Sequence, residues 1–194
     1  MVDMIIVGQT IGKEALAAVG ATGSITFLII GFAQGLTAGL SIITAQRFGA
    51  QDFRGVKKSF AVAIIISFTV TAILTVLSLV FLRPLLLLMQ TPPDIIQQAQ
   101  EFISVILGGM FASMAFNLLS NMIRALGDSR TPLFFLIFAV IINVILDLVF
   151  IINFHMGIAG AGYAIVIAQI SASLMCVIYI KRKIPLLQVS KSDF

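Results

Sequence analysis

The sequence predicts an all-α integral membrane protein, a polytopic bundle of helices that crosses the bilayer several times. Three observations lead to this fold class. Hydrophobic residues make up 60% of the 194 positions, charged residues only 10%, and the mean hydropathy is +1.14. Soluble domains, by contrast, carry about 25% charged residues. The apolar residues also gather in runs of about 20, the length that crosses the hydrocarbon core as a helix.

Five such runs follow one another along the chain, and each is predicted to be one membrane-spanning helix. Short polar segments separate the runs. Arg47 before Gly49, and Arg124 before Gly127, are typical of helix ends, because glycine often follows a helix and a cation is favoured at its last turn. Pro132 stands where the next helix can begin without losing a needed N–H group. The predicted spans are residues 22–45, 59–82, 102–123, 133–152 and 157–180.

The first twelve residues are apolar but too short to span a membrane. They do not form a signal peptide either, because no basic leader is present and an acid stands at Asp3. Two interpretations stay open. The segment is a loose terminal tail, or it is the second half of a helix whose beginning is missing from this chain.

The basic residues indicate the orientation of the spans. Ten of the twelve lie in the links at 47–58 and 124–130 or after Ile180, and the other two are Lys13 and Arg83. The positive-inside rule places the first group, including the carboxy-terminal tail, in the cytoplasm. No aromatic-basic motif accompanies this charge, so nucleic acid is not an expected partner. The single cysteine, Cys176, excludes an intrachain disulfide and a cysteine-based metal site.

The span at 133–152 contains only two strongly polar residues, Asn143 and Asp147. They are four positions apart and therefore share one helix face. A carboxylate at membrane depth costs several kcal/mol and usually faces a bundle interior or a wet cavity. Asp147 is therefore a candidate for ion or proton movement. The alternative is that it pairs structurally with a neighbouring helix.

A second acid is expected at a similar depth. Asp3 lies nine residues before Gly12 and Asp147 lies six before Asn153, so the two carboxylates are about 13 Å and about 9 Å from the outer ends of their helices. Asn143 is about 15 Å from the same end. These three side chains could share a cavity. Carboxylate and amide oxygens suit a hard cation such as Na⁺, and intramembrane acids also serve as proton relays.

Other polar side chains within the spans are candidates for the wall of a cavity. Hydrogen bonding between helices in lipid is an equally ordinary role for them. A stripe of small residues, Gly31, Gly35 and Gly39, predicts a close packing face along the first complete span. The cavity candidates are Gln34, Asn117, Asn121 and Gln169.

Four segments together resemble the multidrug and toxic compound extrusion (MATE) transporters, and the resemblance covers nearly the whole chain. They are VDMIIVGQTIGKEALAAVG, GLTAGLSIITAQRFGAQD, NMIRALGDSRTPL, and NVILDLVFI with the following GIAGAGYA. The family implies twelve helices in two six-helix lobes. By this resemblance, residues 1–183 form one amino-terminal lobe, with five full spans and a partial first helix. Residues 184–194 are then a cytoplasmic tail or the start of an interlobe linker.

The resemblance also implies a function, which is not enzymatic. MATE transporters of the bacterial or archaeal plasma membrane export organic cations and amphipathic compounds against an inward flow of H⁺ or Na⁺. In relatives of this subtype, an acid on helix one and an Asn/Asp pair on helix five form the cation site, and these roles carry over to Asp3, Asn143 and Asp147. Related sites can include a hydroxyl on helix six where this chain has Ile165, a departure that counts against a complete Na⁺ site and leaves H⁺ open beside Na⁺.

The length of the chain limits the expected activity. Only the first lobe is matched, and alternating access moves one repeat against the other. The isolated chain is therefore not expected to transport without a carboxy-terminal lobe, in the same chain or another. A gene fragment, a truncated product and a non-transporting remnant all stay open.

Two other functions are less favoured. A lipid-linked oligosaccharide flippase of similar fold would be expected to carry cationic residues inside its spans, and none occurs there. An intramembrane aspartyl protease would need a GxGD-like motif, which neither Asp3 nor Asp147 occupies.

Overall fold

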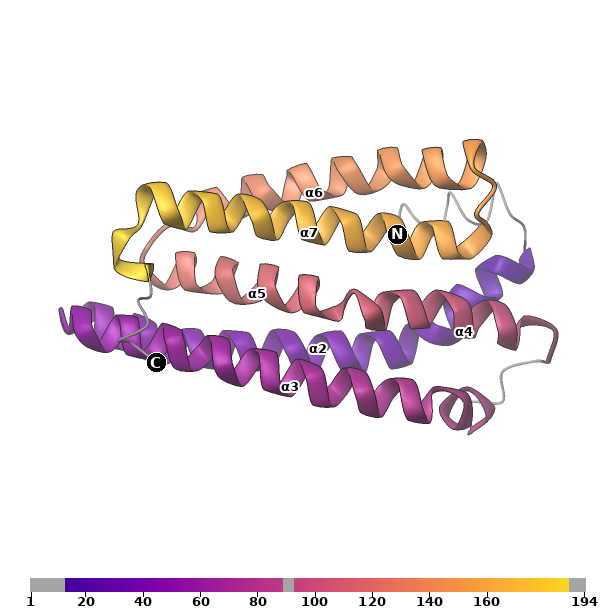
Figure 1. The fold of residues 1–194 in the computed structure, drawn as a ribbon, viewed down its shortest axis with the longest axis horizontal. Coiled ribbons are helices and arrows are strands. Elements are labelled where there is room, and N and C mark those ends of the chain that lie inside the picture. Colours follow the sequence, from indigo (N-terminus) through magenta and orange to yellow (C-terminus); the bar gives the residue numbers. More distant parts are fainter. Residues whose placement is uncertain (1–12, 89–92, 189–194) are drawn as a thin grey trace. The chain divides into compact units, whose positions relative to one another are not determined.

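The computed structural model describes residues 13–88 and 93–188, which are almost entirely helical, and these residues contain no strand (Figure 1). Helix labels follow the figure. The elements are α2 (Lys13–Gly49), α3 (Phe53–Leu88), α4 (Pro93–Gly108), α5 (Met110–Ala125), α6 (Arg130–Leu148), the π-helix η1 (Val149–Asn153), α7 (Gly157–Lys183) and the 3₁₀ turn η2 (Pro185–Leu187).

Four of the five predicted spans are confirmed. Within the described residues, four helical segments are long and apolar enough to cross a membrane, and the fifth predicted span coincides with α4 and α5, a pair bent by 45° at Gly109. The predicted link that starts at Arg83 is too long, because α3 continues through Pro84 to Leu88. The apolar run 85–88 favours continuation of the helix, and Pro93 then opens α4 at a position that needs no N–H donor.

Large apolar side chains cover the outside of these helices. Phe27 and Leu88 are each 80% exposed and Phe134 is 66% exposed. A soluble protein rarely carries so much contiguous apolar surface. In a bilayer the same surface faces lipid, while the helices satisfy their backbone hydrogen bonds internally. The exposure pattern is that of a multi-pass membrane protein.

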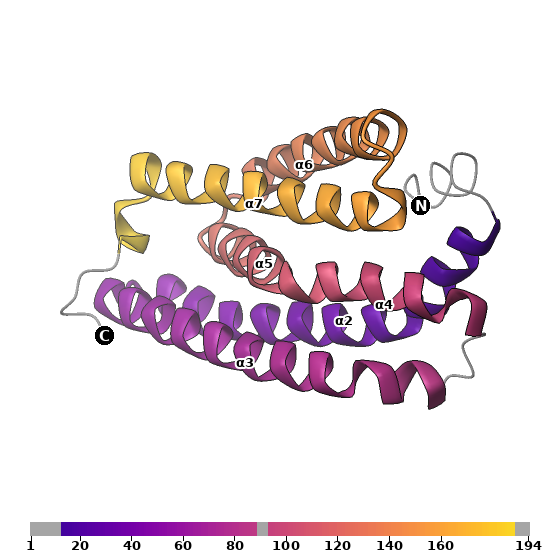
Figure 2. The same ribbon diagram turned by 45° about the vertical axis from the view of Figure 1, so that its right-hand side comes forward.

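The chain divides into two compact units, each assembled from three segments that are far apart in sequence. The first unit contains Met1–Ile30, Ile73–Met110 and Val140–Ala168. The second contains Gly31–Ala72, Phe111–Ala139 and Gln169–Phe194. In the second unit the parts of α2 and α3 lie side by side (Figure 2), and the hydroxyls of Thr44 and Ser59 form a 3.1 Å hydrogen bond between them.

The turn from α2 to α3 is fixed by an aspartate cap. Asp52 precedes α3, and its carboxylate accepts a 2.9 Å hydrogen bond from the backbone N–H of Gly55, the usual role of an N-cap acid. The Arg47 guanidinium donates to the Gly55 carbonyl at 3.2 Å. A Cβ at position 55 would overlap the Asp52 carboxylate and lie 2.7 Å from the guanidinium. A side chain at position 55 would therefore displace the Asp52 carboxylate and the Arg47 guanidinium.

A second acid ties the start of α6 to α7 within the second unit. Asp128 accepts a 3.0 Å hydrogen bond from the Thr131 backbone N–H and a 2.7 Å hydrogen bond from the Tyr179 hydroxyl. Partial burial raises the pKa of this carboxyl, but the hydrogen bonds from Thr131, Tyr179 and the backbone of Arg130 outweigh it, so the pKa lies below its ordinary value.

Replacing Tyr179 with phenylalanine is expected to lower the free energy of unfolding by about 1 kcal/mol at pH 7, because a hydrogen bond to a partly exposed carboxylate is lost. The depressed pKa means that the carboxylate's contribution is present above the unfolded value, about 3.9, and disappears as pH falls through the folded value. The difference in the free energy of unfolding between wild type and variant should therefore be smaller at pH 3 than at pH 7. Thermal unfolding in detergent, followed by circular dichroism at both pH values, measures it.

The matched control is Tyr163→Phe, since Tyr163 is the other tyrosine of the chain and is exposed. That change should leave the free energy of unfolding unaltered at both pH values. A Tyr179→Phe effect of equal size at pH 7 and pH 3 would show that the hydroxyl does not act through the Asp128 carboxylate.

Candidate functional site

Asp147 lies at the end of α6 and is fully buried, with 0% of its surface exposed. Asn143 lies one turn earlier and is half-buried. Its amide nitrogen is buried and has no hydrogen-bond partner among the residues that the structure describes. The spacing of four places both side chains along one side of α6 in the first unit, while Ile141, Ile145 and Leu148 of the same helix are exposed. The polar pair is thus kept away from the apolar outer surface.

The helix changes its winding directly after this pair. The π-helix η1 begins two residues beyond Asp147, and its last turn is closed by a 3.1 Å hydrogen bond from the Phe154 N–H to the Val149 carbonyl. Single-turn π segments are often found at functional sites. The turn continues through His155 and Gly157, whose φ angles of 53° and 61° are left-handed. Sequence reasoning missed this element, since β-branched and aromatic residues alone do not distinguish a π turn from an α-helix.

Close packing holds the other helices of the first unit together. A Cβ on Gly109, at the break between α4 and α5, would overlap the side chain of Val166 on α7. A Cβ on Gly162 would lie 3.1 Å from Val105 Cγ1. A Cβ on Gly160 would lie 3.2 Å from the Cβ of Phe150 in η1. Gly160 and Gly162 of the GIAGAGYA segment therefore permit the close approach of α7 to η1 and α4.

The other candidate residues belong to the second unit. Gln34 is exposed, and its backbone carbonyl accepts a 3.0 Å hydrogen bond from the Thr37 hydroxyl. Asn117 is half-buried and donates to the Ser113 carbonyl at 2.8 Å. Gln169 is half-buried, and its amide oxygen has no hydrogen-bond partner within the described part of the chain.

One polar contact between helices escaped the sequence reasoning. Asn121 on α5 donates a 3.1 Å hydrogen bond to the hydroxyl of Thr37 on α2, and Thr37 is fully buried. This contact assigns Asn121 the ordinary helix-pairing role that was one of its two predicted interpretations. Threonine is common in membrane helices, so its identity alone gave no signal.

The predicted packing stripe is wrong for the chain that the structure describes. Gly31, Gly35 and Gly39 are exposed, and a Cβ added at any of them would meet no atom within 4 Å. Small residues permit close packing, but they do not determine whether another segment packs against them. This face of α2 stays uncovered by the described residues.

The predicted ion site lies only partly within the described residues. Asp3 lies outside the described residues, so its predicted position beside Asn143 and Asp147 stays a prediction. No group of three or more His, Cys, Asp or Glu side chains that could hold a metal ion occurs within 13–88 and 93–188.

Comparison with known proteins agrees with the helical fold. The MatE family model matches residues 1–149. The chain belongs to the MATE family. It is 35% identical to the probable multidrug resistance protein YpnP of Bacillus subtilis (strain 168) over 92% of this chain and 40% of the relative. It is 31% identical to the probable multidrug resistance protein YoeA of the same strain, over 96% of this chain and 41% of YoeA.

Solved MATE structures show the same arrangement of helices. A MATE transporter in its bent conformation matches the whole chain with a TM-score of 0.93 and 28% identity, over 43% of its own length. A MATE-family multidrug resistance transporter in an inward-facing conformation matches with a TM-score of 0.94, over 44% of its length. The chain thus spans about two fifths of the proteins it resembles. The predicted family and the fold of one lobe of a two-lobe MATE protein are confirmed.

Proposed function

We propose that this MATE lobe is part of a cation-coupled multidrug efflux antiporter, and that Asp147 with Asn143 carries the coupling ion. The observation that supports the proposal most directly is the complete burial of Asp147 inside an apolar span of 24 residues. A carboxylate is costly there and is usually retained for ion or proton movement. The relatives whose names describe multidrug resistance make drug export the activity that such an acid would serve.

The chemistry of the pair suits either H⁺ or Na⁺. A proton or cation on Asp147 neutralises a buried negative charge, so occupancy changes the electrostatic free energy of the first unit. Coupling requires that two conformations of the transporter bind the ion with different affinities. A ligand shifts a conformational equilibrium only through its differential affinity for the two states. The buried amide of Asn143, one turn away, can present an oxygen to the cation or donate a hydrogen bond to the carboxylate. Asp3 is proposed as a further ligand.

The substrate is proposed to meet the uncovered face of α2. Gln34 is exposed there beside Gly35, and the small residues leave room for a bulky amphipathic or cationic compound. Asn117 on α5 and Gln169 on α7 are proposed as further polar contacts of the substrate. A second, carboxy-terminal lobe would form the opposite wall, since alternating access needs two repeats that move against each other.

The basic links and tail support an orientation in the inner membrane. We propose that residues 47–58 and 124–130 and the end of α7, with Lys181, Arg182 and Lys183, face the cytoplasm. A cysteine introduced at Ser129 in the link from α5 to α6 should then be shielded from membrane-impermeant maleimide in intact cells. A replacement of Cys176 by alanine removes the background label.

The 194-residue chain expressed alone is expected to give no ethidium efflux above the empty-vector level. A full-length version, made by joining the chain to the unmatched part of YpnP, is expected to extrude ethidium from everted vesicles. An imposed pH gradient or Na⁺ gradient, applied separately, identifies the coupling ion. Robust efflux from the isolated chain would refute the need for a second lobe. A well-inserted full-length version that responds to neither gradient would refute cation coupling.

A further inference from the structure

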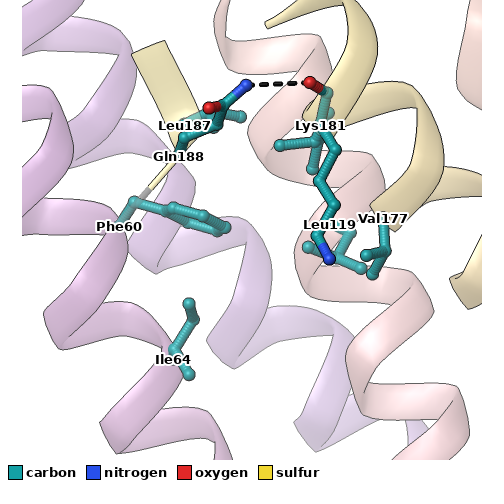
Figure 3. A pocket seen from close by; sticks show the side chains of 8 residues that line it. Phe60, Ile64, Leu119, Val177, Lys181, Leu187 and Gln188 are labelled. Carbon is teal, nitrogen blue, oxygen red and sulfur yellow. Dashed lines mark hydrogen bonds between the residues drawn. The ribbon is translucent and has the colours of Figure 1, made fainter. Parts of the chain in front are cut away.

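A cavity of about 570 Å³ lies in the second unit, between the start of α3, the middle of α5 and the end of α7 (Figure 3). Ligand cavities in proteins commonly have volumes of about 300–1,000 Å³. The lining is apolar apart from two residues, and no acid lies among them. It consists of Phe60, Ile64, Leu119, Val177, Ile180, Lys181, Leu187 and Gln188.

The short turn η2 closes one wall of this cavity. Gln188 donates a 2.8 Å hydrogen bond from its side-chain amide to the backbone carbonyl of Lys181, which folds the segment after α7 back onto the end of that helix (Figure 3). Leu187 is only 2% exposed as a result. The wall is therefore part of the ordered fold.

Lys181 places a positive charge against the apolar lining. Its side chain lines the cavity together with Leu119 and Val177 (Figure 3). This ammonium makes no hydrogen bond or ion pair with any residue that the structure describes. A lysine ammonium normally remains in water while its stem covers apolar surface. Lys181 is exposed, so its ammonium stays hydrated at the edge of the apolar lining and is accessible to an anion.

A second basic residue shares the face of α3 that lines the cavity. On α3, Phe60 and Ile64 are four positions apart and line the cavity. Lys57 is three positions before Phe60 and seven before Ile64, on the same helix face and nearer the start of α3. The cavity thus has one basic residue in its lining, Lys181 of α7, and a second, Lys57, on the face of α3 that supplies Phe60 and Ile64.

We propose that this cavity binds an anionic phospholipid, with its phosphate head group at Lys181 and Lys57 and one acyl chain along the apolar residues. Charge complementarity selects the anion, because the lining offers an ammonium and no carboxylate. The apolar interior selects an acyl chain over a soluble ion. Basic clusters at a membrane surface attract anionic lipids of the cytoplasmic leaflet. The inference does not depend on transport activity, since it concerns only the second unit.

The chain contains no tryptophan, which allows a single-reporter experiment on the full chain in vesicles. Phe60→Trp places the only tryptophan in the cavity wall, and Phe138→Trp places it on an exposed, lipid-facing position of α6. Each variant is reconstituted in phosphatidylcholine containing either brominated phosphatidylglycerol or brominated phosphatidylcholine. In the Phe60→Trp variant, quenching should show that the anionic lipid binds about tenfold more tightly than the zwitterionic lipid, as expected for a charge-assisted contact. In the Phe138→Trp variant the ratio should be near one.

Lys181→Gln in the Phe60→Trp background should bring the ratio close to one. Lys183→Gln is the matched control, because Lys183 is also exposed in the last turn of α7 but does not line the cavity. Native mass spectrometry of the unmutated chain and of Lys181→Gln measures phosphatidylglycerol adducts without a reporter. This second measurement keeps the test open if Phe60→Trp does not fold.

Several outcomes would overturn the proposal. Equal losses in Lys181→Gln and Lys183→Gln would indicate general attraction to a basic surface. Relief of quenching by inorganic phosphate, but not by sodium chloride of equal ionic strength, would assign the site to a soluble anion. Preferential binding that appears only after deletion of residues 189–194 would assign the cavity to the chain's own end. A ratio near one in the Phe60→Trp variant, with no selective adducts in native mass spectrometry, would exclude a lipid site.

Discussion

Replacing Asp147 with asparagine is expected to abolish coupled ethidium efflux by a full-length version while leaving its level in the membrane fraction unchanged. Asparagine has nearly the same shape as aspartate, so packing around this fully buried position should persist. It carries no negative charge and binds no proton at neutral pH. The variant therefore loses the charge that a proton or Na⁺ would neutralise. Extrusion rates in everted vesicles, normalised to protein amount, provide the measurement.

The matched control for Asp147→Asn is Glu101→Gln. Glu101 belongs to the same unit and loses a carboxylate in the same way, but it is exposed on α4. Its efflux should equal that of the wild type. Ethidium extrusion by Asp147→Asn at the wild-type rate would show that this residue does not take part in coupling. A loss of membrane-inserted protein would indicate that the carboxylate instead stabilises the first unit.

The spans could be predicted from the sequence because membrane insertion depends on a local property, the length of an apolar run. The helix ends were less predictable. The sequence around Arg83 and Pro84 resembles a link, yet α3 continues to Leu88. The break at Gly109 and the π turn at Val149–Asn153 both lie where the chain packs closely against α7. Sequence periodicity contains no information about a contact between distant segments.

The residues of the candidate site also divide into those that the sequence could predict and those that it could not. Asp147 and Asn143 were recognisable because polar residues are rare and costly in an apolar helix. The contact between Thr37 and Asn121 was not, since hydroxyls are common in such helices and the partners are 84 positions apart. The stripe of Gly31, Gly35 and Gly39 predicted a packed face that the described chain leaves exposed. The cavity around Lys181 depends on the turn η2, which the sequence reasoning treated as part of a tail.

Replacing Gly109 with alanine is expected to lower the free energy of unfolding by about 2 kcal/mol, within the usual range for overpacking a close-packed interior. Gly109 is buried, and even a Cβ at this position would overlap both methyl groups of Val166. Valine cannot turn aside easily, because its β-branched side chain has one strongly preferred rotamer in a helix. Thermal unfolding in detergent measures the loss.

The double variant Gly109→Ala with Val166→Ala tests whether the contact between position 109 and Val166 causes the loss of stability. Val166→Ala should restore much of the stability lost in Gly109→Ala, since the two residues touch and their effects are therefore not additive. Gly108→Ala is the control within the same turn, because a Cβ there meets no atom within 4 Å. It should be neutral or should stabilise the chain by up to about 1 kcal/mol, as alanine usually does relative to glycine in a helix. Additive losses in Gly109→Ala and Val166→Ala would instead attribute the effect to the backbone at the break, and the close approach of α7 would no longer explain why glycine is needed there.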